Sequence, residues 1–227
     1  MAKVDCRQKG RIFLAMLDNC IRKRYGEYVN NNHSKNGGNI RSYIGQHLPA
    51  FKLNAYQHGD FHEVSDTDLK GKWAVICFYP ADFSFVCPTE LGDLQDHYER
   101  FQAVGAEVYS ASEDTEFVHM AWAEASPTIK KIQYPMLADP AGKLATALDV
   151  RDEASGQAFR GTFIIDPDGV IQAYAVNNFG IGRNADEILR TLQAAQFVAA
   201  HGDQVCPANW QPGAKTLTPG ADLVGKI

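Results

Sequence analysis

The sequence has no CxxC pair, no glycine-rich phosphate-binding motif and no apolar stretch long enough to cross a membrane. The missing CxxC argues against a structural zinc site and against a thioredoxin-type dithiol within one loop. Without a GxGxxG or P-loop pattern, we expect no nucleotide cofactor on this chain, and no histidine or cysteine spacing predicts a metal site. The net charge of −5 gives no bulk attraction to nucleic acid or to an anionic membrane.

Cysteine is scarce, and its count is odd. The five cysteines are scattered as Cys6, Cys20, Cys77, Cys87 and Cys206. This distribution is not typical of a secreted disulfide framework, so we expect a reducing compartment, the cytoplasm. Cys77 lies within an apolar run and is predicted to belong to the core. Cys6 and Cys20 receive no catalytic role.

Composition divides the chain into three parts. Residues 1–42 include a basic stretch and a run rich in Asn and Gly, and we expect a disordered extension there. Residues 43–200 carry regular patterns over a length suited to one domain. Residues 201–227 are rich in Pro and Gly and are predicted to be mostly irregular.

Strand and helix signals alternate in the middle part. The continuous apolar run 73–79 predicts a strand buried on both faces, and 106–112 predicts the next strand. Two alternating runs around a Pro-Asp-Gly turn predict a β-hairpin. Helices are expected over residues 88–105, 115–125 and 185–200. This order predicts an α/β fold with a central mixed β-sheet flanked by helices.

Cys87 stands directly before the first of these helices, and Pro88 suits its first turn. Unpaired N–H groups and the helix dipole favour negative charge at that position, so the thiolate form of a cysteine is stabilised there. The alternative is a buried cysteine with no chemical role. For an arbitrary cysteine, the second interpretation has the better odds.

The surrounding residues change those odds. The stretch FYPADFSFVCPTE, residues 78–90, closely resembles the active-site signature of the peroxiredoxins. The resemblance continues through HMAW, FIIDPDG, GIGR and VCPANW and spans residues 43–227. It is similar in particular to the typical two-cysteine peroxiredoxins of the bacterial alkyl hydroperoxide reductase type. The resemblance implies a thioredoxin-like fold.

The resemblance also implies roles for individual residues. Cys87 would be the peroxidatic cysteine, whose thiolate becomes a sulfenic acid on reaction with peroxide. Arg160 would face the sulfur and grip the peroxide oxygens, with Glu90 holding the arginine in place. Ser84 would orient the peroxide, where the family more often has threonine, and Pro80 would shape the loop and shield the site.

Cys206 aligns with the resolving cysteine, which in this type comes from the other subunit and forms an intersubunit disulfide. The implied assembly is a homodimer, with a ring of five dimers expected. The implied activity is reduction of hydrogen peroxide and organic hydroperoxides. A flavoprotein disulfide reductase using NADH or NADPH, or thioredoxin, would then recycle the enzyme. Two alternative functions are a thiol–disulfide oxidoreductase, which the missing CxxC disfavours, and a holdase chaperone.

Overall fold

The computed structural model describes residues 42–226, so the expected extension, residues 1–42, lies outside the described residues except for its last position. Cys6 and Cys20 also lie outside them. The described chain forms two compact units, residues 42–196 and residues 197–226. Each unit is described by itself.

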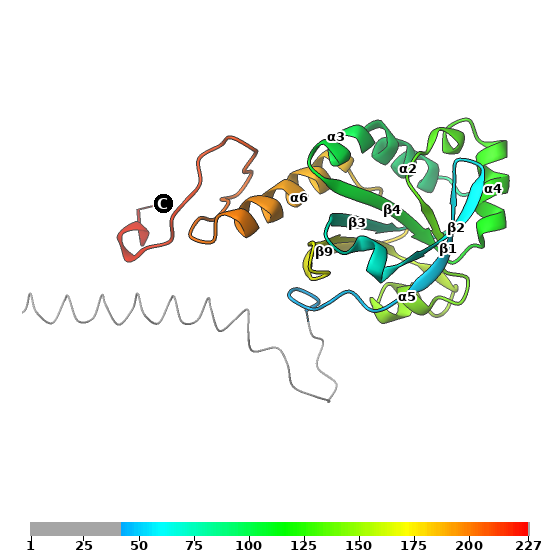
Figure 1. The fold of residues 1–227 in the computed structure, drawn as a ribbon, viewed down its shortest axis with the longest axis horizontal. Coiled ribbons are helices and arrows are strands. Elements are labelled where there is room, and N and C mark those ends of the chain that lie inside the picture. The colour runs from blue at the N-terminus through cyan, green and yellow to red at the C-terminus, as the bar shows by residue number, and fades with distance from the viewer. Residues whose placement is uncertain (1–41, 227) are drawn as a thin grey trace, which may run out of the picture. The chain divides into compact units, whose positions relative to one another are not determined.

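A mixed sheet of seven strands forms the centre of the larger unit, with the order β2-β1-β5-β4-β3-β8-β9 (Figure 1). A separate two-stranded ribbon pairs β6 with β7. The bounds are β1 Lys52–Gln57, β2 Asp60–Ser65, β3 Trp73–Phe78, β4 Ala106–Ser112, β5 Met136–Ala138, β6 Arg151–Asp152, β7 Gln157–Ala158, β8 Arg160–Ile165 and β9 Ile171–Asn177.

Two of the three predicted helices form within one residue of their predicted bounds, the third is divided in two, and a short helix over residues 143–147 was not predicted. The α-helices are α2 Cys87–Asp96, α3 Tyr98–Ala103, α4 Glu116–Ala125, α5 Lys143–Ala147 and α6 Ala185–Ala200, and short 3-10 turns span η1 Asp66–Leu69, η2 Ile129–Lys131 and η3 Ala221–Leu223. The prediction of an α/β fold with a mixed sheet and flanking helices is confirmed. The last helix has the predicted bounds, and the Asn184 side chain accepts a hydrogen bond from the backbone N–H of Glu187 at 3.2 Å, as an N-cap does.

One expected helix is interrupted. Residues 88–105 were predicted to form a single helix, but the helix is interrupted at His97, between α2 and α3. His97 has φ −102° and ψ −2°, outside the regular helical range. Its ring Nδ1 lies 2.8 Å from the carbonyl oxygen of Asp93, so the side chain competes for a helical acceptor. Gly105, with φ 73°, ends the segment as expected.

The strands at the sheet edges differ in how well the sequence predicted them. The expected hairpin is β8 paired with β9, and its turn contains Gly169 with φ 81°. The hairpin of β1 and β2 was not predicted. Its turn residues His58 and Gly59 both have positive φ, but few of its side chains are buried, so the alternation that signals a strand is weak.

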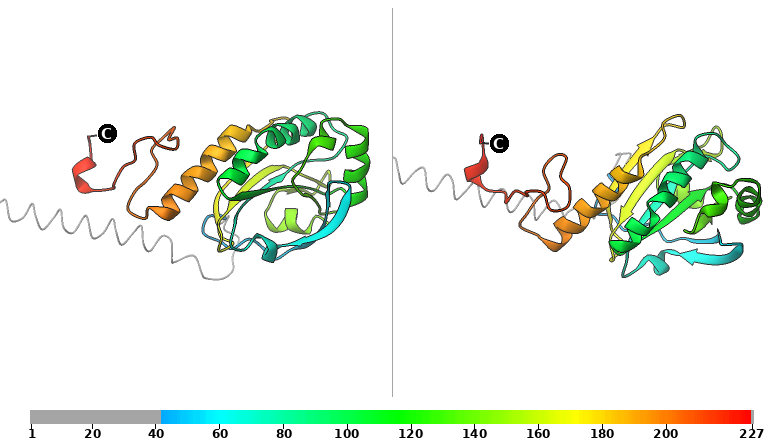
Figure 2. Two further views of the ribbon diagram at one scale, coloured as in Figure 1. Left: turned by 45° about the horizontal axis from the view of Figure 1, so that its top comes forward. Right: turned by 90° about the horizontal axis from the view of Figure 1, so that it is seen from above.

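Two apolar clusters cover the two faces of the sheet. Val75, Cys77 and Val108 face a cluster that includes side chains of α2, α3, α4 and the first half of α6. Ile76 and Phe78 point the other way, toward a cluster that includes α5. Figures 1 and 2 show α2, α3 and α6 together on one side of the sheet and α5 on the other. The strict alternation along β3 explains why its sequence is apolar throughout.

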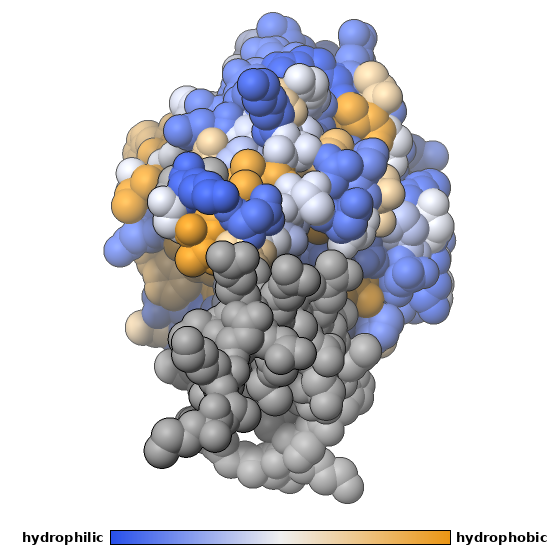
Figure 3. Space-filling view, turned by 90° about the vertical axis from the view of Figure 1, so that its left-hand side faces the viewer, coloured by the Kyte–Doolittle hydropathy of each residue, from blue (hydrophilic) through white to orange (hydrophobic). Residues whose placement is uncertain are grey.

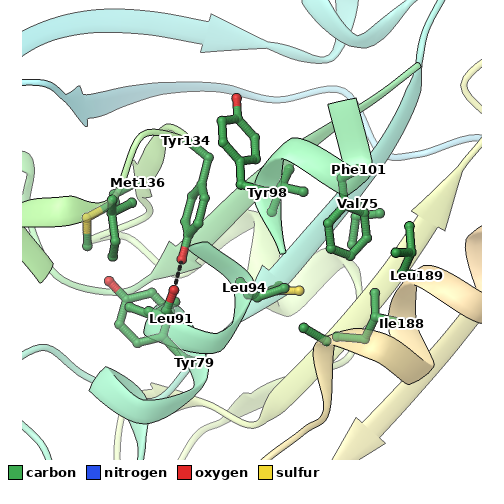
Figure 4. Packing of buried hydrophobic residues seen from close by; sticks show 14 of the residues in the cluster. Val75, Tyr79, Leu91, Leu94, Tyr98, Phe101, Tyr134, Met136, Ile188 and Leu189 are labelled. Carbon is green, nitrogen blue, oxygen red and sulfur yellow. Dashed lines mark hydrogen bonds between the residues drawn. The ribbon is translucent and has the colours of Figure 1, made fainter. Parts of the chain in front are cut away.

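Among the described residues, Ser110 Oγ and one carboxylate oxygen of Glu113 are buried without a hydrogen-bond partner, whereas the buried tyrosine hydroxyl at Tyr134 is paired. Figure 4 shows the Tyr134 hydroxyl donating a hydrogen bond to the carbonyl oxygen of Leu91 in α2, at 2.8 Å. Tyr134 is fully buried, and this bond joins α2 to the segment between η2 and β5. The outer surface seen in Figure 3 is mostly hydrophilic, with separate hydrophobic spots. No helix within residues 42–226 has the length and apolar character to cross a membrane.

The buried hydroxyls and thiol predict a loss of stability at high pH. Burial raises the pKa of the Cys77 thiol and of the Tyr79 and Tyr134 phenols. The unfolded chain ionises them nearer pH 9–10, releasing protons that the folded chain keeps, so the free energy of unfolding falls as pH rises above about 9. Urea unfolding measured at several pH values gives the free energy of unfolding as a function of pH. Above pH 10, we expect this free energy to fall less steeply for Tyr134→Phe than for the wild type, by about 1.4 kcal/mol per pH unit. An unchanged slope would contradict this assignment.

Candidate active site

Cys87 occupies the first position of α2, and its side chain is fully buried. The helix begins there because Pro88 suits a first turn, while the apolar positions that follow face the core. No side chain caps this helix end. The sulfur therefore lies where the helix N–H groups and dipole favour an anion.

Arg160 reaches the sulfur from another element. It is the first residue of β8, it is 3% exposed, and its Nη1 lies 3.4 Å from Sγ of Cys87. The antiparallel register pairs Cys77 with Thr162, so Arg160 lies at the end of the sheet where β3 passes into the loop before α2. The sheet thus brings together two residues that are 73 positions apart.

Glu90 binds two guanidinium groups at once. One carboxylate oxygen accepts a hydrogen bond from Arg160, and the other accepts bonds from the backbone N–H and Nε of Arg183, each at 2.8 Å. The carboxylate is 3% exposed, and the two arginine side chains are 3% and 7% exposed. Nε of Arg160 also donates to the carbonyl oxygen of Phe179 at 2.8 Å. We call Glu90, Arg160 and Arg183 the charge cluster.

The family resemblance implies that Glu90 holds Arg160, but it gives Arg183 no role. Arg183 belongs to the GIGR stretch, yet a single arginine after two glycines carries no local sign of its partners. In the structure its Nη1 also donates to the carbonyl oxygen of Gly161, at 2.9 Å, next to Arg160 in β8. Arg183 therefore fixes both the carboxylate that holds Arg160 and the strand that carries it.

Pro80 and Ser84 lie in the loop between β3 and α2. Pro80 is buried and follows the end of β3 closely. The Ser84 hydroxyl donates a hydrogen bond to the carbonyl oxygen of Ala81 at 2.8 Å, which fixes its rotamer within the loop. Its oxygen keeps lone pairs that can accept a further hydrogen bond.

Two buried side chains of α4 lie against residues of this loop. Trp122 is 3% exposed, and its ring lies 6.2 Å from that of Tyr79 and 6.1 Å from that of Phe83, centroid to centroid. His119 is fully buried, and its Nδ1 lies 2.7 Å from a carboxylate oxygen of Asp82. No motif in the sequence predicted this pair.

The remaining cysteines differ in environment. Cys77 is fully buried in β3, which confirms the prediction of a core residue. Cys206 is partly exposed and lies in the unit formed by residues 197–226. Within residues 42–226, no group of three or more His, Cys, Asp or Glu side chains is arranged to hold a metal ion.

A groove of about 290 Å³ opens beside the charge cluster. Residues of β8, β9 and the start of α6 line it, including Thr162, Tyr174 and Arg183. Cys87 is not among the lining residues. Arg160 is not among them either, so the buried contact between the sulfur and Arg160 lies outside this groove.

A buried thiol at a helix start facing an arginine, on a mixed sheet with helices on both faces, is the arrangement expected of a thiol peroxidase with a thioredoxin-like fold. Comparisons with known families agree. Residues 44–174 match the AhpC/TSA family, and residues 194–225 match the C-terminal domain of 1-Cys peroxiredoxin. The chain belongs to the AhpC/TSA family and is a peroxiredoxin, an oxidoreductase that acts on peroxide.

Individual relatives support this assignment. Alkyl hydroperoxide reductase C of Staphylococcus saprophyticus is 55% identical over 188 residues, covering 82% of this chain and all of the relative. The crystal structure of Enterococcus faecalis AhpC is 57% identical, with a TM-score of 0.72, and covers 74% of this chain and all of that one. The reduced 2-Cys peroxiredoxin of Plasmodium vivax is 35% identical, with a TM-score of 0.73, over 78% of this chain and 93% of that one.

The charge cluster predicts a large difference between two glutamate substitutions. Glu90→Gln leaves two buried guanidinium groups with one neutral partner, so we expect the free energy of unfolding to fall by about 3–5 kcal/mol. Glu187→Gln is the matched control, because it removes a glutamate–arginine pair whose carboxylate side chain is 61% exposed. That change should cost less than about 1 kcal/mol. Urea unfolding measures both, and equal losses would contradict the assignment.

Proposed function

We propose that Cys87 is the peroxidatic cysteine and that it reduces hydrogen peroxide and organic hydroperoxides. Its thiolate attacks the terminal peroxide oxygen, so an S–O bond forms while the O–O bond breaks. The departing alkoxide or hydroxide takes a proton and leaves as alcohol or water, and the sulfur remains as a sulfenic acid. The observation that carries the proposal is the 3.4 Å approach of Arg160 to a fully buried sulfur at a helix start.

The charges around the sulfur support a thiolate nucleophile. Two guanidinium groups, Arg160 and Arg183, face one carboxylate, Glu90, which leaves one positive charge in excess. An anionic sulfur would neutralise that excess in a place where water does not screen it. The same Arg160 guanidinium can bind the oxygens of the peroxide as negative charge develops on the leaving group.

We assign Pro80 and Ser84 to shaping the site. Pro80, buried at the end of β3, would direct the loop over the sulfur and keep water away from it. The Ser84 oxygen, held in place by its bond to Ala81, would accept a hydrogen bond from the peroxide and align the O–O bond with the sulfur.

Cys206 is assigned as the resolving cysteine, acting from a second subunit. A disulfide needs Cα atoms about 4.4–6.8 Å apart, and a fully buried Cys87 in the first turn of α2 is held away from any incoming chain. The start of α2 and its loop would therefore unfold locally before the disulfide forms. Within this scheme, residues 43–200 form the peroxidase domain and residues 201–227 the resolving segment. The compact units divide between residues 196 and 197, close to that boundary.

A homodimer is then the smallest active assembly, and a ring of five dimers is the expected form. The edge strand β9 supports self-association, because Tyr174 and Val176 are apolar side chains exposed by 38% and 47%. The disulfide would be reduced by a flavoprotein disulfide reductase using NADH or NADPH, or by thioredoxin, in the cytoplasm.

Peroxide consumption tests the first half-reaction. Cys87→Ser should abolish peroxide consumption, whereas a holdase activity would not depend on this thiol. Arg160→Gln should slow the reaction of the thiol with peroxide by about 10²–10³-fold, because a buried group that stabilises developing charge is lost. Arg100→Gln is the matched control, since it removes an exposed arginine that pairs with Asp186. Stopped-flow mixing measures the rates, and equal rates for the two arginine variants would contradict the role of Arg160.

Non-reducing electrophoresis after one equivalent of peroxide tests the second half-reaction. Wild-type protein should run as a covalent dimer, and both Cys87→Ser and Cys206→Ser should remain monomeric. Cys77→Ser is the control and should form the dimer like wild type, because Cys77 is buried in β3. A covalent dimer in the Cys206→Ser variant would show that another thiol resolves the sulfenic acid.

A further inference from the structure

The loop between β3 and α2 carries the proposed site. Its first residues, Tyr79 and Pro80, are buried, but the apolar side chains that follow them are not. Phe83 is 56% exposed and Phe85 is 93% exposed. Among residues 81–86, Asp82 is the buried one. Apolar burial within the single chain therefore does not explain how residues 81–86 keep their conformation.

The loop backbone is also strained. Phe83 has φ 53°, in the left-handed region, where a bulky side chain is rarely found. Such a conformation persists only where the neighbouring residues are held firmly by other contacts, and it tends to occur at functional sites. The residue directly before Phe83 is Asp82.

Both carboxylate oxygens and the backbone N–H of Asp82 have hydrogen-bond partners. Its Oδ1 accepts a hydrogen bond from the Tyr79 hydroxyl at 2.7 Å, and its Oδ2 lies 2.7 Å from Nδ1 of His119. Its backbone N–H donates to a carboxylate oxygen of Asp114 at 2.9 Å. That same oxygen accepts a bond from the Ser112 hydroxyl at 2.8 Å. Burial raises the pKa of the Asp82 carboxyl, and the hydrogen bond with His119 acts in the opposite direction.

His119 joins the loop to two other elements. It belongs to α4, its side chain has no exposed surface, and its Nε2 lies 3.2 Å from the carbonyl oxygen of Leu137 in β5. Both ring nitrogens therefore face oxygen atoms. One proton on Nε2 and one shared between Nδ1 and Asp82 satisfy both contacts, and the pair is then neutral as a whole whichever partner holds the shared proton.

We infer that Asp82 and His119 are a positioning pair, which anchors the loop to α4 and β5 and holds Ser84 and Cys87 in the arrangement that reacts with peroxide. The inference rests on the proposed function. It gives the pair opposite effects on the two half-reactions. A firmly anchored loop favours attack on peroxide, whereas disulfide formation requires the same loop to leave its place.

The test separates the two rates in each variant. The rate of sulfenic acid formation is measured by quenched-flow trapping, and the rate of the subsequent disulfide is measured by mass spectrometry under non-reducing conditions. His119→Leu removes both ring contacts and should lower the first rate about tenfold, the effect of losing about 1.4 kcal/mol of loop anchoring, while the second is unchanged or faster. His119→Asn keeps a donor for Asp82 and should give an intermediate ratio of the two rates.

Three further variants guard against a merely structural effect. Tyr98→Phe is the matched control, since it removes a hydroxyl–carboxylate bond to Glu107 of 3.2 Å that lies outside the loop, and it should leave the ratio of rates unchanged. Tyr79→Phe removes one hydrogen bond to Asp82 and carries the test if His119→Leu does not fold. Asp82→Asn combined with His119→Leu should lower the rate of sulfenic acid formation by less than the two single changes predict together, because the two residues act through each other.

The possible results point to different conclusions. A lowered ratio of peroxide attack to disulfide formation in the His119 and Tyr79 variants supports the positioning pair. Parallel loss of both rates, in proportion to stability in urea, overturns it, as does an unchanged ratio. If Cys87→Ser still consumes peroxide, the proposed function is wrong, and the positioning role fails with it. If Cys87→Ser is inactive and the ratio does not change, only the positioning pair is wrong.

Discussion

The buried bonding of Glu90 to two arginines is the interaction on which the site depends. Arg160 binds one carboxylate oxygen of Glu90, and Arg183 binds both, with Nε 2.8 Å from one oxygen and Nη2 3.2 Å from the other. All three side chains are nearly buried, so little water is available to compensate for a poor fit. A buried charge without its partner is costly, so the three side chains impose strict relative positions on α2, β8 and the segment before α6. The sulfur of Cys87 lies at the point where these elements meet, next to the one guanidinium that contacts it.

The sheet supplies the frame for this cluster. β3 lies between β4 and β8, and its antiparallel pairing with β8 brings Arg160 to the end of β3 from which the loop leads to α2. The same pairing aligns Thr162 with Cys77. A shift of register by one residue would move the apolar side chains of the strand out of their cluster, so the register is fixed. Packing of the core thus sets the distance between sulfur and guanidinium.

The loop between β3 and α2 is bound by polar contacts at both of its ends. The charge cluster lies at the Cys87 end, and Asp82 is joined to Tyr79, His119 and Asp114 at the other. Between them, the aromatic side chains of the loop are largely exposed in the single chain. A segment held by a few specific bonds, and not by a broad apolar interface, can be placed accurately and can still leave as a unit, which the proposed two-step chemistry requires.

Local patterns in the sequence determined much of this protein. The position of Cys87 at a helix start, the alternation of strands and helices and the β8–β9 hairpin follow from periodicity, proline and turn residues, and the likeness to a family indicated Arg160 and Glu90. Only the tertiary structure revealed Arg183 and His119 as partners of Glu90 and Asp82, across 93 and 37 positions. The physical reason is that periodicity reports which face of an element is apolar, whereas the partner of a single buried charge depends on how distant elements pack together.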